Sequence, residues 1–190
     1  MSRNRHGFSL VELLIVVAII GILAVLTIPA FITISDAKQI TAANQSLSDG
    51  LRLARQLALV KSTPVEFRLW NIMPKDGLTT SYCAYSYNQI TDSGVTNFGK
   101  LTYFAKGVSL STGSANNYST LVTVGLVTIS STNSYASFSF RPDGSTDLNP
   151  TSKWFATFVR DREVTSSSLP KNYITLRIDP LNGNVSYYRP

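Results

Sequence analysis

Cysteine, histidine and charged residues are all scarce in this chain. Its 190 residues include one cysteine, Cys83, and one histidine, and only 15% of them are charged. A single cysteine excludes an intrachain disulfide framework and a zinc site built from several cysteines. The histidine, His6, lies in a short basic N-terminus. The body of the chain therefore has no histidine to serve in catalysis.

The chain does contain an ordinary share of hydrophobic residues, 44%, together with a net charge of +6. A hydrophobic share of this size is typical of folded proteins and excludes disorder as the overall description. The length suits one ordinary domain with an attached element rather than two large domains.

A long uncharged segment follows the N-terminus. Residues 13–35 carry no charge, and about 20 apolar residues are enough for a helix to cross a bilayer. Arg3 and Arg5 precede this segment, so the positive-inside rule places the N-terminus in the cytoplasm and the rest of the chain outside. A cleaved secretory signal and a simple membrane anchor are alternatives. Neither explains Glu12, because a carboxylate within a membrane span is costly and usually marks a partner.

A specific motif surrounds Glu12. Residues 7–13 read GFSLVEL, which resembles the type IV prepilin signature, G-F-[ST]-L-[IV]-E-[LM]. The resemblance implies that a prepilin peptidase cleaves between Gly7 and Phe8 and that the new Phe8 amine is N-methylated. It also implies assembly with other pilins or pseudopilins, in which Glu12 would meet the Phe8 amine of a neighbouring subunit. Because a buried charge needs a partner, Glu12 would set the register of assembly. A residue that snorkels at the membrane face is the alternative.

One long helix is predicted over residues 9–61. Gly21 and Pro29 fall where pilin-like helices often carry a Gly and a Pro. The resemblance implies that the helix loosens there within the filament, which fits the weak helix preference of both residues. Farther along, apolar residues recur at steps of three and four on one face: Ile40, Ala43, Leu47, Leu51, Ala54 and Ala58. Pro64 ends the pattern, because the residue before a proline avoids helical geometry.

After Pro64 the pattern changes to alternation and turns. Strands are predicted over residues 65–70, 82–87, 100–104, 121–129, 135–140, 155–160, 173–178 and 185–188. Residues 182–183, Asn-Gly, predict a hairpin between the last two strands. The predicted fold is α+β and pilin-like: a long N-terminal helix, half transmembrane and half amphipathic, packed on an antiparallel β-sheet head. The expected parts are a leader at 1–7, a transmembrane or filament-core helix at 8–35, an amphipathic helix at 36–62 and a head at 63–190.

A second resemblance narrows the class. Residues 51–58, LRLARQLA, followed by PVEF at 64–67, resemble the helix-to-strand passage of GspH/FimT-type minor pseudopilins. Residues 138–144, FSFRPDG, are similar to a later strand and turn of that group, whereas residues 71–135 show no match. The resemblance implies a structural subunit, not an enzyme, of a type II secretion pseudopilus or a type IV pilus. It also implies a single-pass protein of the bacterial inner membrane with a periplasmic head.

The alternative function is that of a DNA- or surface-binding pilus-tip protein. Some DNA-binding members of the group carry a G-R-x-R type pattern near the C-terminus, whereas residues 183–186 here read GNVS. The tentative nucleic-acid contacts are the basic residues of segment 151–190: Lys153, Arg160, Arg162, Lys171, Arg177 and Arg189. Three acidic residues reduce the net charge of this segment to +3. Because DNA affinity needs several phosphate contacts from one face, we expect an ordinary solvated surface.

Other chemical motifs are weak. Residues 143–147, DGSTD, and 179–184, DPLNGN, resemble fragments of calcium loops, but neither has the full loop with its closing Glu. Asx turns explain both segments equally well, so we assign no metal and no cofactor. Cys83 has no histidine outside the leader to activate it and is expected to be a buried, apolar cysteine. The sequence has no P-loop and no nucleophile elbow, and we expect no enzyme.

Overall fold

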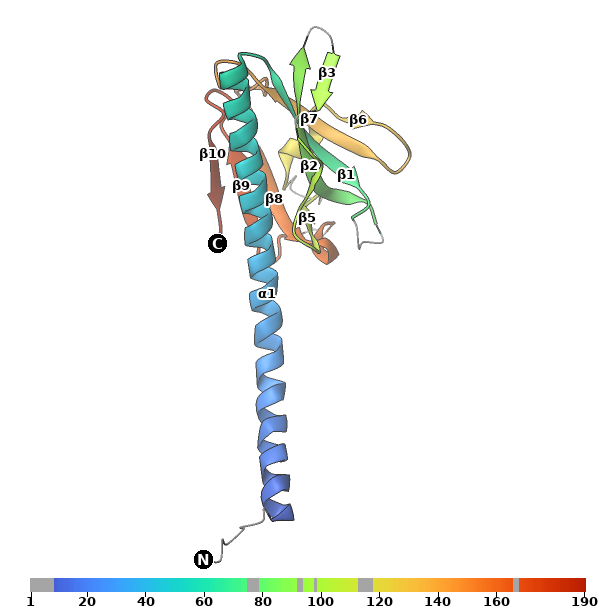
Figure 1. Cartoon of the computed structure of the whole chain (residues 1–190), viewed down its shortest axis with the longest axis vertical. Helices are drawn as coiled ribbons and strands as arrows, with labels where there is room; N and C mark the ends of the chain where they lie inside the picture. Colours follow the sequence, from blue (N-terminus) through green and yellow to red (C-terminus); the bar gives the residue numbers. More distant parts are fainter. Residues whose placement is uncertain (1–8, 75–78, 92–93, 98, 113–117, 166–167) are drawn as a thin grey trace, which may run out of the picture. The chain divides into compact units, whose positions relative to one another are not determined.

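The structure is a computed structural model of the whole chain. It describes residues 9–74, 79–91, 94–97, 99–112, 118–165 and 168–190, and only the backbone for residues 26–33 and 95–97. The chain divides into two compact units, Met1–Asp36 and Ala37–Pro190. The second unit contains all the strands and the part of the helix that packs on them (Figure 1).

The helix α1 spans Leu10–Lys61. In the second unit the helix buries the predicted stripe, because each of the six apolar residues of the stripe, from its first, Ile40, to its last, Ala58, is at most 1% exposed. This result confirms the helical periodicity of the sequence. The helix ends at Lys61, where Ser62 adopts a positive φ of 52°, and Pro64 prevents its continuation.

Sheet A contains six strands: β1 (Val65–Ile72), β2 (Ser81–Thr91), β3 (Gly94–Asn97), β4 (Thr102–Tyr103), β6 (Val127–Thr128) and β7 (Ser134–Phe140). Their order is β3-β2-β1-β7-β6, with β4 also paired to β2, and the pairs are antiparallel. β1 is central and alternates as the sequence predicts. Val65, Phe67 and Leu69 are buried, whereas Glu66, Arg68 and Trp70 on its other face are half-buried.

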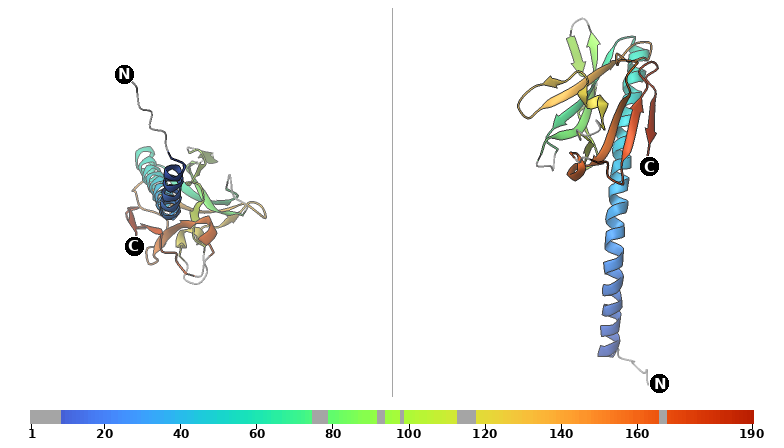
Figure 2. Two further views of the ribbon diagram at one scale, coloured as in Figure 1. Left: turned by 90° about the horizontal axis from the view of Figure 1, so that it is seen from below. Right: turned by 180° about the vertical axis from the view of Figure 1, so that it is seen from behind.

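Sheet B contains four strands in the order β10-β9-β8-β5. Their bounds are Val108–Leu110 for β5, Trp154–Arg160 for β8, Ile174–Ile178 for β9 and Val185–Tyr188 for β10. The predicted hairpin between the last two strands is confirmed, because β9 and β10 are paired antiparallel and Gly183 adopts a positive φ of 64° in the connection. The view from behind shows β8, β9 and β10 side by side (Figure 2).

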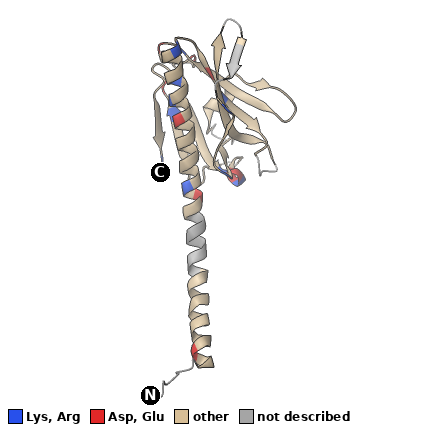
Figure 3. Ribbon diagram, in the orientation of Figure 1, with Lys and Arg blue, Asp and Glu red and all other residues tan. Residues whose placement is uncertain are grey.

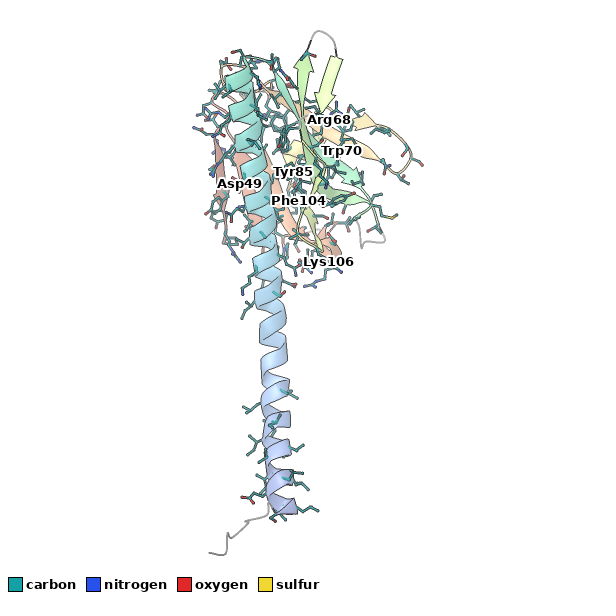
Figure 4. The ribbon with its side chains drawn as sticks, in the orientation of Figure 1. Asp49, Arg68, Trp70, Tyr85, Phe104 and Lys106 are labelled. Atoms are coloured by element: carbon teal, nitrogen blue, oxygen red, sulfur yellow. The ribbon has the colours of Figure 1, made fainter. Side chains whose placement is uncertain are left out.

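A chain of aromatic rings joins the two sheets in one core. Phe138 and Tyr85 flank Phe67 at ring distances of 5.8 and 5.4 Å. Phe104 lies 6.0 Å from Tyr85 and 5.1 Å from Phe158 of sheet B. Figure 4 shows Tyr85 and Phe104 beside α1, where both rings are more than nine-tenths buried. The core thus forms between the helix and both sheets.

The α+β prediction, with a long N-terminal helix packed on antiparallel strands, is confirmed, but the head has two sheets instead of one. The strand predicted over residues 121–129 is wrong. A 3₁₀ helix, η1 (Thr120–Thr123), occupies its start, and only β6 is extended. Leu121 and Val122 are both buried, which consecutive residues of a half-buried strand do not achieve. Strands β3 and β5 were not predicted. A second 3₁₀ helix, η2 (Asp161–Glu163), follows β8.

Candidate functional site

The N-terminal motif places Glu12 in the first turn of α1. The predicted cleavage site, Gly7 and Phe8, lies outside the described residues. Within the described part, the backbone N–H of Ser9 donates to Glu12 Oε2 at 3.4 Å. This is one half of a capping box, in which a Glu three residues after the capping Ser reaches back to its amide. Glu12 therefore has a local role at the helix start, and the S-x-x-E spacing could have indicated this role from the sequence.

The large apolar side chains from Leu10 to Val25 are exposed on all sides of the helix. The large hydrophobic residues from Leu10 to Val25 range from 45% exposed at Val16 to 79% at Leu10. Gly21 and Pro29 both lie within α1, and a Cβ added at Gly21 would meet no atom within 4 Å. Among the residues with described side chains, no helix is both long and apolar enough to span a membrane.

The basic residues considered as DNA contacts do not gather on one face. Arg160 Nη1 donates to Gln39 Oε1 and, at 3.1 Å, to the carbonyl of Lys106, at the edge of the head near α1. Arg162 is exposed and lies 3.8 Å from Glu163. Figure 3 shows that positive and negative residues also alternate along α1 within the second unit, where Lys and Arg are interspersed with Asp and Glu.

Arg189 lies near α1, whereas Lys153 and Arg177 lie together on sheet B. Arg189 donates to Thr41 Oγ1 at 3.0 Å and to Asn172 Oδ1 at 3.3 Å. Lys153 and Arg177 line the same groove on sheet B. Lys171 is exposed in the loop before β9 and does not line that groove. Two of the six candidate contacts are therefore brought together, and the expectation of an ordinary solvated surface stays a prediction.

Both Asx-rich segments form local turns in which a carboxylate accepts hydrogen bonds from residues close in the chain. Asp143 Oδ1 accepts hydrogen bonds from the amide and the hydroxyl of Ser145, at 2.8 and 2.6 Å, and these bonds lower the pKa of Asp143 below its usual value. Asp179 likewise accepts from the Leu181 amide and from Asn182 Nδ2. The carboxylates are thus engaged in local turns. Among the described residues, no three His, Cys, Asp or Glu residues are placed to hold a metal ion.

Cys83 is buried on β2, as the sequence predicts, at 3% exposure. Burial raises the pKa of its thiol to about 11, and the Asp161 carboxylate contributes to the shift in the same direction. The thiolate is the reactive form of cysteine. The environment of Cys83 therefore suits packing rather than nucleophilic chemistry.

The aromatic residues around Lys153 and Arg177 were missed by the sequence reasoning. Phe155, Tyr173 and Tyr188 line the same groove as the two cations. A usable signal was present in β9, where Ile174, Leu176 and Ile178 alternate with Thr175 and Arg177. This alternation assigns the polar residues to the outer face of the sheet, but it does not say which strands are neighbours.

Comparisons with known proteins concern mainly the N-terminal segment. The family described as "Prokaryotic N-terminal methylation motif" matches residues 2–28. The type IV major fimbrial protein FimA of Dichelobacter nodosus is 49% identical over 55 residues, which are 28% of this chain and 32% of that protein. A second protein of that organism, described as a fimbrial protein, matches to the same extent. The chain thus spans about a third of the length of these curated relatives.

Two solved structures are similar over more of the chain. The minor pseudopilin EpsH from the type 2 secretion system of Vibrio cholerae has a TM-score of 0.46 at 14% identity, covering 82% of this chain and 98% of that chain. The type IV minor pilin FimU of Pseudomonas aeruginosa has a TM-score of 0.48 at 11% identity, covering 80% of this chain and 93% of that chain. On the sequence matches, the N-terminal segment of this chain is type IV prepilin-like.

Proposed function

We propose that this chain is a minor pilin or pseudopilin, a structural subunit of a type IV pilus or a type II secretion pseudopilus. The observation that carries the proposal is the prepilin motif at residues 7–13, which continues into the start of α1, where the large apolar side chains from Leu10 to Val25 are exposed. The match of residues 2–28 to the methylation motif supports it. A prepilin peptidase would cleave between Gly7 and Phe8 and leave the apolar helix on the mature chain, with Phe8 N-methylated.

The exposed apolar side chains at the start of α1 require a partner surface that removes them from water. Large hydrophobic side chains from Leu10 to Val25 are all at least 45% exposed, and burial of apolar surface gains about 25 cal/mol per Å². Before assembly, lipid would cover these side chains in the bacterial inner membrane, with the N-terminus in the cytoplasm and the head outside. In the filament, helices of neighbouring pilins would replace the lipid. Gly21 and Pro29 would let the helix loosen as it is repacked, because both have a weak helix preference.

Glu12 would have two successive partners. In the single chain its carboxylate accepts a long hydrogen bond from the Ser9 amide, which is a weak interaction at 3.4 Å. In a filament, the positive amine of Phe8 on a neighbouring subunit would be a stronger partner, because a short contact between two opposite charges is stronger than a long hydrogen bond to an uncharged amide. The exchange of one partner for the other would set the register between subunits.

The test is the N-terminus of the mature chain. We would extract the full-length protein from membranes with and without a prepilin peptidase, and determine its intact mass and N-terminal sequence. We expect a chain that begins at methylated Phe8 only when the peptidase is present. The variant Gly7→Val should remain uncleaved, whereas His6→Gln, which changes the neighbouring residue outside the motif, should be processed. A wild-type chain that starts at Met1 in both hosts would overturn the proposal.

A further inference from the structure

The outer face of sheet B carries an open groove of about 460 Å³. The helix α1 packs on the inner face, where Ile174, Leu176 and Ile178 are buried. Figure 1 shows α1 in front of β8 and β9, and the reverse view in Figure 2 shows these strands in front of α1. The groove thus lies on the side of the sheet that faces away from the helix, and its volume is in the range of ligand sites.

The strand register arranges the groove in two rows. Arg177 on β9 is opposite Phe155 on β8 and Ser186 on β10. In the next outward row, Thr175 is opposite Thr157 and Tyr188, and the hydroxyls of Thr157 and Thr175 lie 3.0 Å apart. Residues of the two rows lie on the same face because side chains alternate along a strand. Phe155 and Tyr188 therefore flank Thr175 and Arg177, whereas Thr157 lies beneath them at 1% exposure.

The aromatic side chains of the groove are open to solvent. Tyr188 is 61% exposed, and Phe155 and Tyr173 are half-buried. Clustered exposed apolar surface with polar groups at its rim is typical of binding sites. A tyrosine ring offers an apolar face together with a hydroxyl that can hydrogen-bond. Such a surface favours a ligand that is itself flat and apolar on one side and polar at its edges.

The charge of the groove has one sign. Among the described residues that line it, Lys153 and Arg177 are the only charged ones, and neither has an ion-pair partner in the described part of the chain. Arg177 is exposed beside Phe155, so its guanidinium is available for a bidentate bond to a carboxylate. The groove is therefore complementary to a ligand that carries separate negative charges.

We propose that this groove binds an acidic polysaccharide, a chain of sugar rings that carries carboxylates. A pyranose ring has a flat C–H face that would stack on Tyr188 or Phe155, and its hydroxyls would reach Thr175 and the exposed Ser186. Carboxylates of the polymer would pair with Arg177 and Lys153. The proposal concerns the second unit alone and does not rest on the function proposed above.

The placement of the other cations favours a polysaccharide over a nucleic acid. A single strand of nucleic acid carries one phosphate per nucleotide, and its affinity depends on many phosphate contacts. Only two of the six basic residues in segment 151–190 line the groove. Arg160 donates to Gln39 and Lys106 instead, and Arg189 donates to Thr41 and Asn172. Two cations can pair with two carboxylates of a sugar chain, whereas strong binding of a nucleic acid needs more phosphate contacts than this groove offers.

The experiment is isothermal titration calorimetry on the full-length chain in detergent. The probes are tetragalacturonate, the neutral cellotetraose and a ten-nucleotide oligo-dT, all at low salt. We expect tetragalacturonate to bind, cellotetraose to bind more weakly and oligo-dT to bind least. The proposal is overturned if tetragalacturonate does not bind, if the neutral sugar binds as tightly, or if oligo-dT binds more tightly than either sugar.

Two exposed residues locate the site. Arg177→Gln should weaken tetragalacturonate binding about tenfold, which is the loss expected for a hydrogen bond to a charged group. Tyr188→Ala should weaken both sugars about three- to tenfold through the lost ring. The controls are Arg162→Gln, an exposed arginine outside the groove, and Ile129→Ala, an exposed residue next to sheet A. Unchanged binding by both groove variants, each with an unaltered unfolding midpoint, would also overturn the proposal.

Discussion

Gly50 brings the backbone of α1 against the ring of Tyr85 on β2. A Cβ at this position would lie 2.8 Å from Tyr85 Cζ and 2.9 Å from the hydroxyl oxygen. The same hydroxyl donates to the carbonyl of Ser46 at 2.9 Å, so the ring cannot shift without loss of this bond. The helix and the sheet are therefore held at a distance that only glycine allows.

Gly50→Ala is expected to lower the free energy of unfolding by about 1–3 kcal/mol through overpacking. Helix propensity alone would give the opposite sign, a gain of about 1 kcal/mol. The measurement is urea unfolding followed by circular dichroism. In a Tyr85→Leu background the clash is relieved, and Gly50→Ala should then be neutral or stabilising. The same loss in both backgrounds would contradict the close approach.

Cys83 is expected to react slowly in the native chain. With a thiol pKa of about 11, its thiolate fraction at pH 8 is about a thousandth, against about a quarter for an ordinary cysteine. Alkylation by iodoacetamide at pH 8, followed by mass spectrometry, should be at least about a hundredfold slower than in guanidinium, and its rate should rise with pH up to about 11. Equal rates in native and unfolded chains would contradict the raised pKa.

At the scale of elements, β1 connects the two halves of sheet A. It pairs with β2 on one side and with β7 on the other. Its residue Phe67 is fully buried and contacts the rings of Tyr85 and Phe138. Large aromatic residues in such positions contribute most of the core contact area, so the central strand should be sensitive to truncation.

Phe67→Ala is expected to cost about 3–5 kcal/mol of stability, because it removes buried apolar area and leaves a cavity. Leu53 lies on α1 and is 42% exposed. Leu53→Ala should therefore lower the free energy of unfolding by less than about 1 kcal/mol. Both values would come from urea unfolding of the detergent-solubilised chain. Similar losses for the two variants would mean that the core does not centre on β1.

At the scale of the whole molecule, substitutions of Glu12 test the filament proposal. They can separate its role at the helix start from its role as partner of a neighbouring subunit. Glu12→Gln keeps an acceptor for the Ser9 amide that now contacts Glu12 Oε2, but it removes the charge. It should be cleaved after Gly7 yet enter filaments on the order of a hundredfold less, since an unpaired buried amine costs several kcal/mol. Quantitative mass spectrometry of sheared filaments and membranes from the native host measures this ratio.

Two further variants complete this test. Glu12→Asp retains the charge and should recover part of the incorporation, although its shorter side chain reaches less far. Asp36→Asn changes the other carboxylate of the first unit that lies within α1 and should be incorporated like the wild type. If Glu12→Gln enters filaments normally, the role of Glu12 is limited to the helix start.

Local patterns were sufficient for the elements whose signal lies within a few residues. The prepilin motif is contiguous, and the stripe from Ile40 to Ala58 follows from helical periodicity. The turn at Gly144, which has a φ of 83°, and the hairpin at Gly183 follow from residue types that tolerate positive φ. The strand prediction at 121–129 failed because Leu121 and Val122 are buried by tertiary contacts of a 3₁₀ turn, which local propensity does not report.

The sequence by itself determined the motif at the N-terminus, the long helix with its buried face, and most of the strands. Only the tertiary structure decided that the strands divide into two sheets, and that Phe155, Arg177 and Tyr188 share one outer face. The physical reason is the range of the interactions. Helical periodicity and turn chemistry act between near neighbours, whereas the pairing and register of strands depend on backbone hydrogen bonds and core packing between residues far apart in the chain.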